Sequence, residues 1–205
     1  MSLREVKQLR TRQALAEAAA DLFRRKGFDA TTIADVAAAA EVGTRTLFRY
    51  FASKEDLLFP DHDDRVQAAV RTIEASAPSE RPAEVLLRAL AQAESDDDIV
   101  SGMTALRLRL MREHPAVRGK ALQLYSDAQL EISRALANAF PDRFDTLTAA
   151  ALTGAFAGAV QGVLCALIQD RADVDDPAEY RAIVDRATRT ALAPWLAETF
   201  PSSAL

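Results

Sequence analysis

Cysteine is nearly absent from this chain, which has only Cys165 among its 205 residues. One cysteine cannot form an internal disulfide, and neither a CxxC pair nor a Cys/His spacing typical of zinc sites occurs. The two histidines, His62 and His114, have no recognisable catalytic neighbours, and the GxSxG, HExxH and phosphate-binding glycine-loop motifs are missing. These absences favour a reduced, cytoplasmic protein, and they predict no enzymatic activity, no cofactor and no metal site.

Glycine (7 residues), proline (8 residues) and aromatic side chains (6%) are also scarce, and the apolar–polar alternation typical of strands is almost absent. Alanine, the strongest helix former, is abundant. The composition therefore predicts an all-α fold, and the spacing of the apolar residues places about nine helices along the chain.

Negative charge predominates, with a net charge of −5, but it is unevenly distributed. Residues 1–58 contain ten Lys or Arg and eight Asp or Glu, a net charge of +2, whereas the remainder carries −7. The acidity belongs to the C-terminal part, so the N-terminal part could still present a positive face to nucleic acid.

Three helices are predicted in the N-terminal part. Apolar residues at helical spacing predict a long amphipathic helix over residues 4–26, and Gly27 is a natural C-terminal stop. Thr32 caps a short second helix, with Asp35 at the capping-box position. After a tight turn at residues 41–43, a third helix runs over residues 44–51, with Leu47 and Phe51 pointing inward and Phe48 partly so.

Further helices fill the rest of the chain. Ser53 caps a fourth helix that Pro60 kinks or breaks, and Pro60 is either a hinge between two domains or a harmless kink. Helices are predicted over residues 83–94, after an acidic cap over 97–112, and over 115–139, where Pro115 occupies the first position. A last amphipathic helix includes residues 180–195.

Residues 147–168 contain no charged side chain, which makes them a membrane-span candidate by length. Their content of Ala, Gly, Thr and Gln and the lack of an aromatic belt argue against a membrane span. A helix without a polar face must still be buried, and we expect a partner chain to bury it. Glycines spaced four residues apart would allow a helix of the partner chain to approach closely, although they could instead allow close packing within one chain. The expected homodimer interface contains Gly154, Gly158, Gly162, Ile183, Val184, Ala187, Ala191 and Trp195.

Two short helices joined by a tight turn and braced by a longer one form the helix-turn-helix arrangement. The second short helix must bury one face and expose donors on the other, and Thr44, Arg45, Arg49 and Tyr50 supply these donors. An arginine near a helix start suits bidentate contact with guanine. The alternative is an ordinary solvated polar face.

The segment from about Arg10 to Leu58 resembles the DNA-binding domain of the TetR-type repressors. The matching runs are LF and KGF around residues 22–28, TTI at 31–33, Val42, TLF and YF at 46–51, and SKE with LL at 53–58. The family often has Gly where Glu41 stands and Ser where Gly43 stands. The run at residues 45–51 further resembles a subgroup that includes mycofactocin-associated regulators, in which acyl-thioester effectors are suspected.

The resemblance implies a DNA-binding domain over residues 1–53 and a helical effector-binding and dimerisation domain over residues 54–205. It implies that Thr44, Arg45 and Arg49 face bases or flanking phosphates of a double-stranded operator, and that phosphates are contacted by Thr32, Thr46, Tyr50 and Lys54. It also implies a homodimer formed through the last two helices, acting as a repressor that a small-molecule effector releases from a palindromic operator.

The effector pocket of the family lies among the central helices, and its candidate lining residues here are Met103, Tyr125, Gln129, Phe156 and Gln161. Each has an ordinary alternative, as core filling or as a half-exposed polar side chain. Two other classes of protein stay open: a helical carrier whose helix-turn-helix is vestigial, which only Glu41 supports, and an enzyme, for which no residue set can be named.

Overall fold

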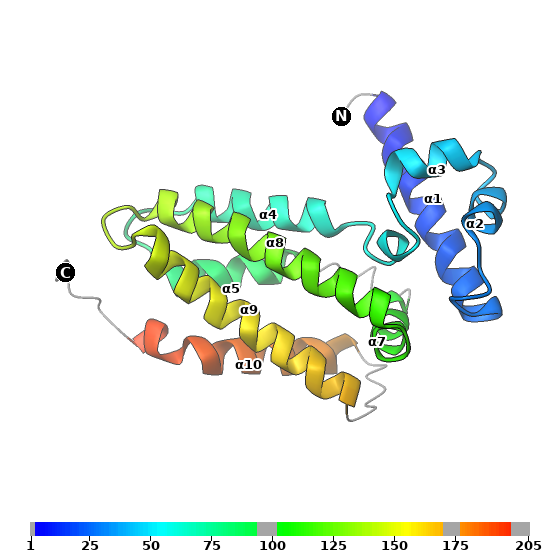
Figure 1. The fold of residues 1–205 in the computed structure, drawn as a ribbon. Coiled ribbons are helices and arrows are strands. Elements are labelled where there is room, and N and C mark those ends of the chain that lie inside the picture. The colour runs from blue at the N-terminus through cyan, green and yellow to red at the C-terminus, as the bar shows by residue number, and fades with distance from the viewer. Residues whose placement is uncertain (1–2, 94–101, 170–176, 198–205) are drawn as a thin grey trace. The chain divides into compact units, whose positions relative to one another are not determined.

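A computed structural model describes residues 3–93, 102–169 and 177–197. These residues form nine α-helices and one short 3-10 helix, and no strand occurs in the parts described. The helices (Figure 1) are α1 (Leu3–Lys26), α2 (Ile33–Ala39), α3 (Thr44–Tyr50), α4 (His62–Glu74), α5 (Pro82–Ala93), α7 (Met103–Glu113), α8 (Pro115–Ala139), α9 (Thr146–Gln169) and α10 (Pro177–Ala197), with the 3-10 helix η1 (Glu55–Leu58) between α3 and α4. The predicted all-α fold is therefore confirmed.

Local signals explain most helix ends. Gly27 has a φ of +86°, the left-handed conformation that glycine adopts without steric cost, and its N–H donates to the Phe23 carbonyl at 3.2 Å. Thr32 caps α2 in the predicted capping box with Asp35. Pro115 is the first residue of α8, as predicted. The acidic cap and the helix start predicted at residues 95–98 lie outside the described residues.

The segment after α3 differs from the prediction of a longer helix capped by Ser53. Ser53 and Asp56 do form reciprocal hydrogen bonds, but the helix that they start is the 3-10 helix η1, which ends at Leu58. Because the ring of Pro60 disfavours the helical conformation at the residue before it, Phe59 leaves the helix with a φ of −127° and a ψ of +50°. The helix resumes at His62, so the predicted break at Pro60 is confirmed.

The chain divides into two compact units. The first contains residues 1–61 and 106–120, so it continues beyond residue 53 and includes most of α7 and the start of α8. Its core is built by α1, α2, α3 and η1 together with the α7–α8 corner: Leu15, Ala19, Phe23, Phe28, Val36, Leu47, Phe51, Leu57, Leu58, Leu110 and Val117 are all buried. The stacking of Phe23 on Phe28, with ring centres 4.9 Å apart, fixes the end of α1 against the loop that follows it.

The second unit contains residues 62–105 and 121–205. In it α4 packs against α5, and α10 packs against both α9 and α5. Its core is apolar and drawn from every helix of the unit: Val66, Val70, Ile73, Val85, Leu86, Leu136, Phe140, Leu152, Phe156, Val160, Leu164, Val184 and Leu192 are buried.

Candidate nucleic-acid interface

Helix α3 is anchored by two side chains and exposes the rest of its length. Leu47 is fully buried and Phe51, which ends the helix, is 3% exposed, so each contributes about 1.5–3 kcal/mol by its burial. The predicted inward position of Leu47 and Phe51 is confirmed. Phe48 was predicted to be partly inward, but it is 56% exposed, so this part of the prediction is wrong.

The exposed side of α3 carries the donors that the sequence predicted for DNA. Thr44, Arg45 and Arg49 are exposed, and Thr46 and Tyr50 are half-buried. The Arg49 guanidinium lies over the Tyr50 ring, 5.0 Å from its centre, and donates a hydrogen bond to the Tyr50 hydroxyl at 3.2 Å. This contact holds the guanidinium against a flat support, which lowers the entropy lost when it binds a phosphate or a base.

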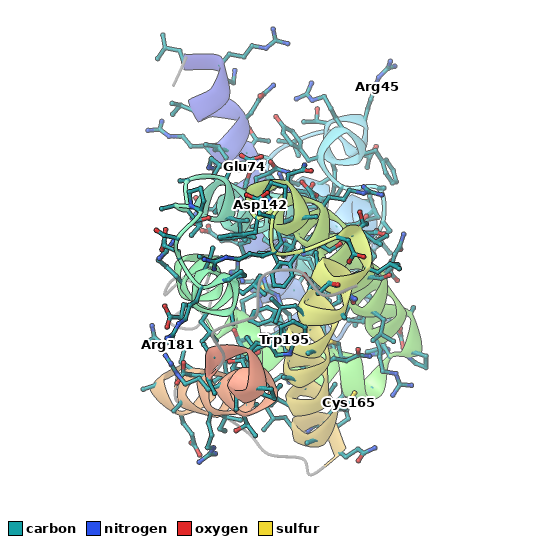
Figure 2. The ribbon with its side chains drawn as sticks, turned by 90° about the vertical axis from the view of Figure 1, so that its left-hand side faces the viewer. Arg45, Glu74, Asp142, Cys165, Arg181 and Trp195 are labelled. Carbon is teal, nitrogen blue, oxygen red and sulfur yellow. The ribbon has the colours of Figure 1, made fainter. Side chains whose placement is uncertain are left out.

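Arg45 is placed differently from Arg49. Figure 2 shows its side chain extending outward from the end of the unit, and it has no ion-pair or hydrogen-bond partner among the described residues. A guanidinium with all its N–H donors available is suited to reading the O6 and N7 atoms of guanine, which no other base pair presents in the same way.

The turn between α2 and α3 contains a strained residue. Glu41 has a φ of +54°, the only non-glycine residue with a positive φ among those described. Its exposed side chain puts a carboxylate directly before the helix that carries Arg45. TetR-type repressors often have glycine at this position, and glycine adopts the left-handed conformation without strain. The glutamate at this position therefore has a conformational cost of about 1–2 kcal/mol.

Thr32 and Asp35 form a closed pair at the start of α2. The Thr32 hydroxyl accepts from the Asp35 N–H at 3.1 Å and donates to an Asp35 carboxylate oxygen at 2.9 Å. Hydrogen bonds from the Thr32 backbone and side chain, followed by one from Lys26, hold the pKa of Asp35 below its ordinary value. The Thr32 hydroxyl is therefore engaged in the cap, and Thr32 as a phosphate contact stays a prediction.

Lys54 has a role inside the unit that the sequence analysis missed. Its ammonium donates to the carbonyl oxygens of Phe28 at 2.8 Å and Thr31 at 3.2 Å, and it lies 4.2 Å from the centre of the Phe28 ring. These contacts tie the segment after α3 to the loop before α2. Two of its three N–H donors are thus used internally, which leaves one for a phosphate.

The α7–α8 corner stabilises the same segment from another direction. Lys120 on α8 forms an ion pair with Asp56 at 2.7 Å, and Arg107 on α7 donates to the Leu58 carbonyl and lies over the Phe59 ring. Burial acts to raise the pKa of Asp56, but hydrogen bonds from Lys120 and Ser53 outweigh it, so that this pKa lies below its ordinary value. No sequence signal reveals these contacts, since they join residues about 50 or more positions apart.

The residues predicted for the effector pocket are spread over different environments in the second unit. Met103 and Phe156 are buried, Tyr125 and Gln129 are half-buried, and Gln161 is exposed on α9. An open cleft of about 550 Å³ lies elsewhere in this unit, lined by Ala68, Arg71, Thr72, Ala75 and Arg88. The five predicted residues are absent from its lining, and their role as an effector pocket stays a prediction. Within the described residues no group of three His, Cys, Asp or Glu side chains could hold a metal ion.

The glycines of α9 fall into two kinds. A Cβ atom at Gly154 would lie 3.2 Å from the Gln129 amide nitrogen, so this glycine admits a side chain of the same protomer. A Cβ atom at Gly158 or Gly162 would meet nothing within 4 Å, and both residues are exposed. Close packing within one chain therefore explains Gly154, but it does not explain Gly158 or Gly162.

One face of α9 is exposed and uncharged. It contains Leu147, Ala151, Gly158, Gln161, Gly162, Cys165, Ala166 and Gln169, of which Leu147 is 79% exposed; Figure 2 shows Cys165 at the outer edge of the helix. On α10, Ile183, Ala187, Ala191 and Trp195 are half-buried. Val184, which the sequence placed in the dimer interface, is only 2% exposed, since it packs into the core of its own protomer. By length and composition alone α9 could cross a membrane, a test that helices of soluble proteins also pass.

The sequence of the first unit matches a known family. Residues 15–59 match the family described as "Bacterial regulatory proteins, tetR family". Over 113 residues, 54% of this chain, the sequence is 33% identical to the HTH-type transcriptional regulator TcmR of Streptomyces glaucescens. The match spans half the length of that relative.

Solved structures resemble nearly the whole chain in fold. A protein of Mesorhizobium loti assigned to the TetR-family transcriptional regulators has a TM-score of 0.54 at 14% identity, with 91% of this chain and 97% of that chain covered. FadR of Thermus thermophilus, a TetR-family transcriptional repressor solved in complex with lauroyl-CoA, has a TM-score of 0.53 at 19% identity, with 94% and 97% covered. At these identities the likeness concerns the fold, which continues beyond the N-terminal unit.

Proposed function

Because this chain belongs to the TetR-type transcriptional regulators, we propose that it is a cytoplasmic homodimer that represses transcription from a palindromic operator and is released by a small molecule. In this proposal residues 1–53 contact the DNA, and residues 54–205 bind the effector and form the dimer. The observation that carries it is the outward side of α3, where Arg45 has no partner among the described residues and Thr44 and Arg49 lie beside it.

The proposed base reading depends on Arg45. The guanidinium is exposed, unpaired among the described residues, and held on a helix that Leu47 and Phe51 fix in place. Arg49 and Tyr50 support each other and are suited to flanking phosphates or bases. Each bidentate arginine–guanine contact contributes about 1–3 kcal/mol of discrimination.

The homodimer is supported by the exposed face of α9. The eight exposed positions on this face are all uncharged, which is unusual for a solvent-exposed helix. A second copy packed through α9 and α10 would cover it, and a two-fold dimer would present two α3 helices to two half-sites about 34–36 Å apart.

The experiment that tests the function is selection of operators from a random duplex library by the purified protein, followed by binding to DNA that flanks its own gene. We expect a palindromic consensus, and we expect Arg45→Ala to lose base preference at one position of each half-site by about 1–3 kcal/mol. A matched Arg71→Ala variant on α4 should keep the consensus. Enrichment of no duplex would contradict the proposal and favour the helical carrier with a vestigial helix-turn-helix.

Release by an effector is tested separately. The lauroyl-CoA bound by the Thermus thermophilus repressor makes acyl-thioesters the first compounds to screen for a shift in melting temperature and for release from the selected operator. A compound that binds only the folded protein at 100 times its Kd should stabilise it by about 2.7 kcal/mol.

A further inference from the structure

The first turns of α1 form a basic segment outside the part of the chain that matches the TetR family. The family match begins at residue 15, whereas α1 begins at Leu3. Residues 3–14 contain four cations, Arg4, Lys7, Arg10 and Arg12, and one acidic residue, Glu5, a net charge of +3. This short segment therefore has more net positive charge than residues 1–58 taken together.

Three of these four cations are uncompensated among the residues that the structure describes. Arg4, Lys7 and Arg10 are exposed and form no ion pair or side-chain hydrogen bond with any residue that the structure describes. At the other end of the same helix two of the three cations have partners: Arg24 pairs with Asp21, and Lys26 pairs with Asp35, each at 3.3 Å. The two ends of α1 thus differ in how their charge is compensated.

Arg12 connects the basic segment to the recognition helix. Its guanidinium carbon lies 5.8 Å from the centre of the Phe51 ring, at the end of α3. Its Nε atom is buried and has no hydrogen-bond acceptor among the described residues. The Arg12 side chain as a whole is half-buried against α3, so Arg12 joins α1 to α3 and is not one of the exposed cations.

The basic segment and the exposed side of α3 lie at the same end of the first unit. Figure 1 shows the first half of α1 beside α3, and in Figure 2 the start of α1 projects in the same direction as the side chain of Arg45. With a rise of about 1.5 Å per residue, the distance from Arg4 to Arg10 along the helix is about 9 Å, which corresponds to two or three base pairs of duplex.

We propose that Arg4, Lys7 and Arg10 bind backbone phosphates of duplex DNA next to the groove that α3 enters. The proposal rests on the proposed function and adds a second contact to it. A group of exposed cations with no carboxylate partner among the described residues complements the negative charge of the phosphate backbone. Such contacts add affinity and fix the register of the reading helix, but they carry no base information.

The test is the triple variant Arg4→Gln, Lys7→Gln, Arg10→Gln. Glutamine has nearly the same helix propensity as arginine and lysine, so α1 should keep its helical content, which circular dichroism checks. The matched control is Arg71→Gln, Arg134→Gln, Arg186→Gln, which removes the same charge from exposed positions of the second unit. The probe is a fluorescein-labelled random-sequence duplex of about 30 base pairs, long enough for two half-sites, with anisotropy measured at roughly 50 to 200 mM salt.

The expected result is a Kd at least about tenfold weaker for the α1 variant at the lowest salt, with a slope of log Kd against log salt that falls by about 0.9 for each lost contact. The control variant should keep the slope of the unsubstituted protein, and both variants should select the same operator consensus. An unchanged slope for the α1 variant would overturn this proposal while the DNA-binding function stands, and so would an altered consensus. Failure of the unsubstituted protein to bind any duplex would overturn both.

Discussion

Enlarging Gly158 and Gly162 on α9 should separate the two copies of the proposed dimer without harming the protomer. Both glycines are exposed, and an added Cβ atom at either meets nothing within 4 Å. Within the protomer, therefore, the Cβ atoms of the substitution Gly158→Leu, Gly162→Leu have room, and the rest of each exposed side chain can extend into solvent. It should even favour the helix, since glycine costs about 0.8–1.0 kcal/mol relative to alanine and leucine costs little.

In a dimer packed through this face, the same substitution is destabilising. Two glycines one turn apart allow a close approach of a second helix, and side chains placed there force the helices apart. Overpacking costs about 1–3 kcal/mol at each site, and two-fold symmetry doubles the effect of each substitution. Even one effective site per protomer then costs about 2–6 kcal/mol, which raises the dimer dissociation constant by a factor of roughly 30 to 10⁴.

Sedimentation equilibrium over a range of protein concentrations measures this constant, and circular dichroism verifies that the variant remains helical. The matched control is Gly119→Leu on α8, because Gly119 is also an exposed helical glycine with nothing within 4 Å of an added Cβ. It should stabilise its helix and leave the dimer unchanged. A double leucine variant that dimerises as tightly as the unsubstituted protein would refute the assignment of this face to the interface.

Three further substitutions test the first unit. Glu41→Gly should raise the free energy of unfolding by about 0.5–1 kcal/mol by relieving the positive φ, whereas Glu41→Gln should leave stability unchanged. Both variants should bind duplex DNA more tightly. If thermal melts show equal stability for the two variants, the backbone of Glu41 is not strained. Asp56→Asn should lower stability by about 1–3 kcal/mol by weakening the pair with Lys120. Because the pKa of Asp56 is lowered in the folded state, the difference between the two proteins should be constant above about pH 5 and shrink as pH falls below the ordinary carboxyl pKa of about 3.9, as urea unfolding at several pH values can show. Lys54→Met should lower stability by about 1–3 kcal/mol through loss of the bonds to Phe28 and Thr31; unchanged urea midpoints would contradict its internal role.

The sequence predicted those parts of the fold that short-range chemistry decides. Thr32 with Asp35, Gly27 and Pro115 each act on backbone atoms within about one helical turn, so their effect can be inferred without knowing the tertiary structure. The segment after Ser53 was predicted less well. Ser53 was identified as the residue at which the next helix starts, but the effect of Pro60 on Phe59 limited that helix to the four residues of η1.

Long-range contacts could not be predicted, and Lys54 illustrates the reason. A lysine after a recognition helix is equally suited to a phosphate and to two backbone carbonyls, and the choice depends on where the loop after α1 lies. That loop is placed by the stacking of Phe23, Phe28 and His114, with successive ring centres 4.9 Å apart. His114 comes from the α7–α8 corner, which no pattern in residues 1–61 connects to the first unit.

The same reasoning separates the candidate DNA contacts from the candidate effector contacts. Because Leu47 fixes the orientation of α3, helical periodicity alone places Thr44, Arg45 and Arg49 on its outward side; within this helix only Phe48 was predicted wrongly. A pocket, by contrast, is formed by single side chains from several helices, so an error in the rotation of one helix changes which residues line it. Gln161 shows this directly. It was predicted to line the same pocket as Phe156, but the two residues are five positions apart and face different sides of α9: Phe156 is buried, whereas Gln161 lies on the exposed face beside Gly158 and Gly162. A helix such as α9, which is apolar on all sides, has no polar side in its sequence to mark which face is covered by its own chain and which by a partner.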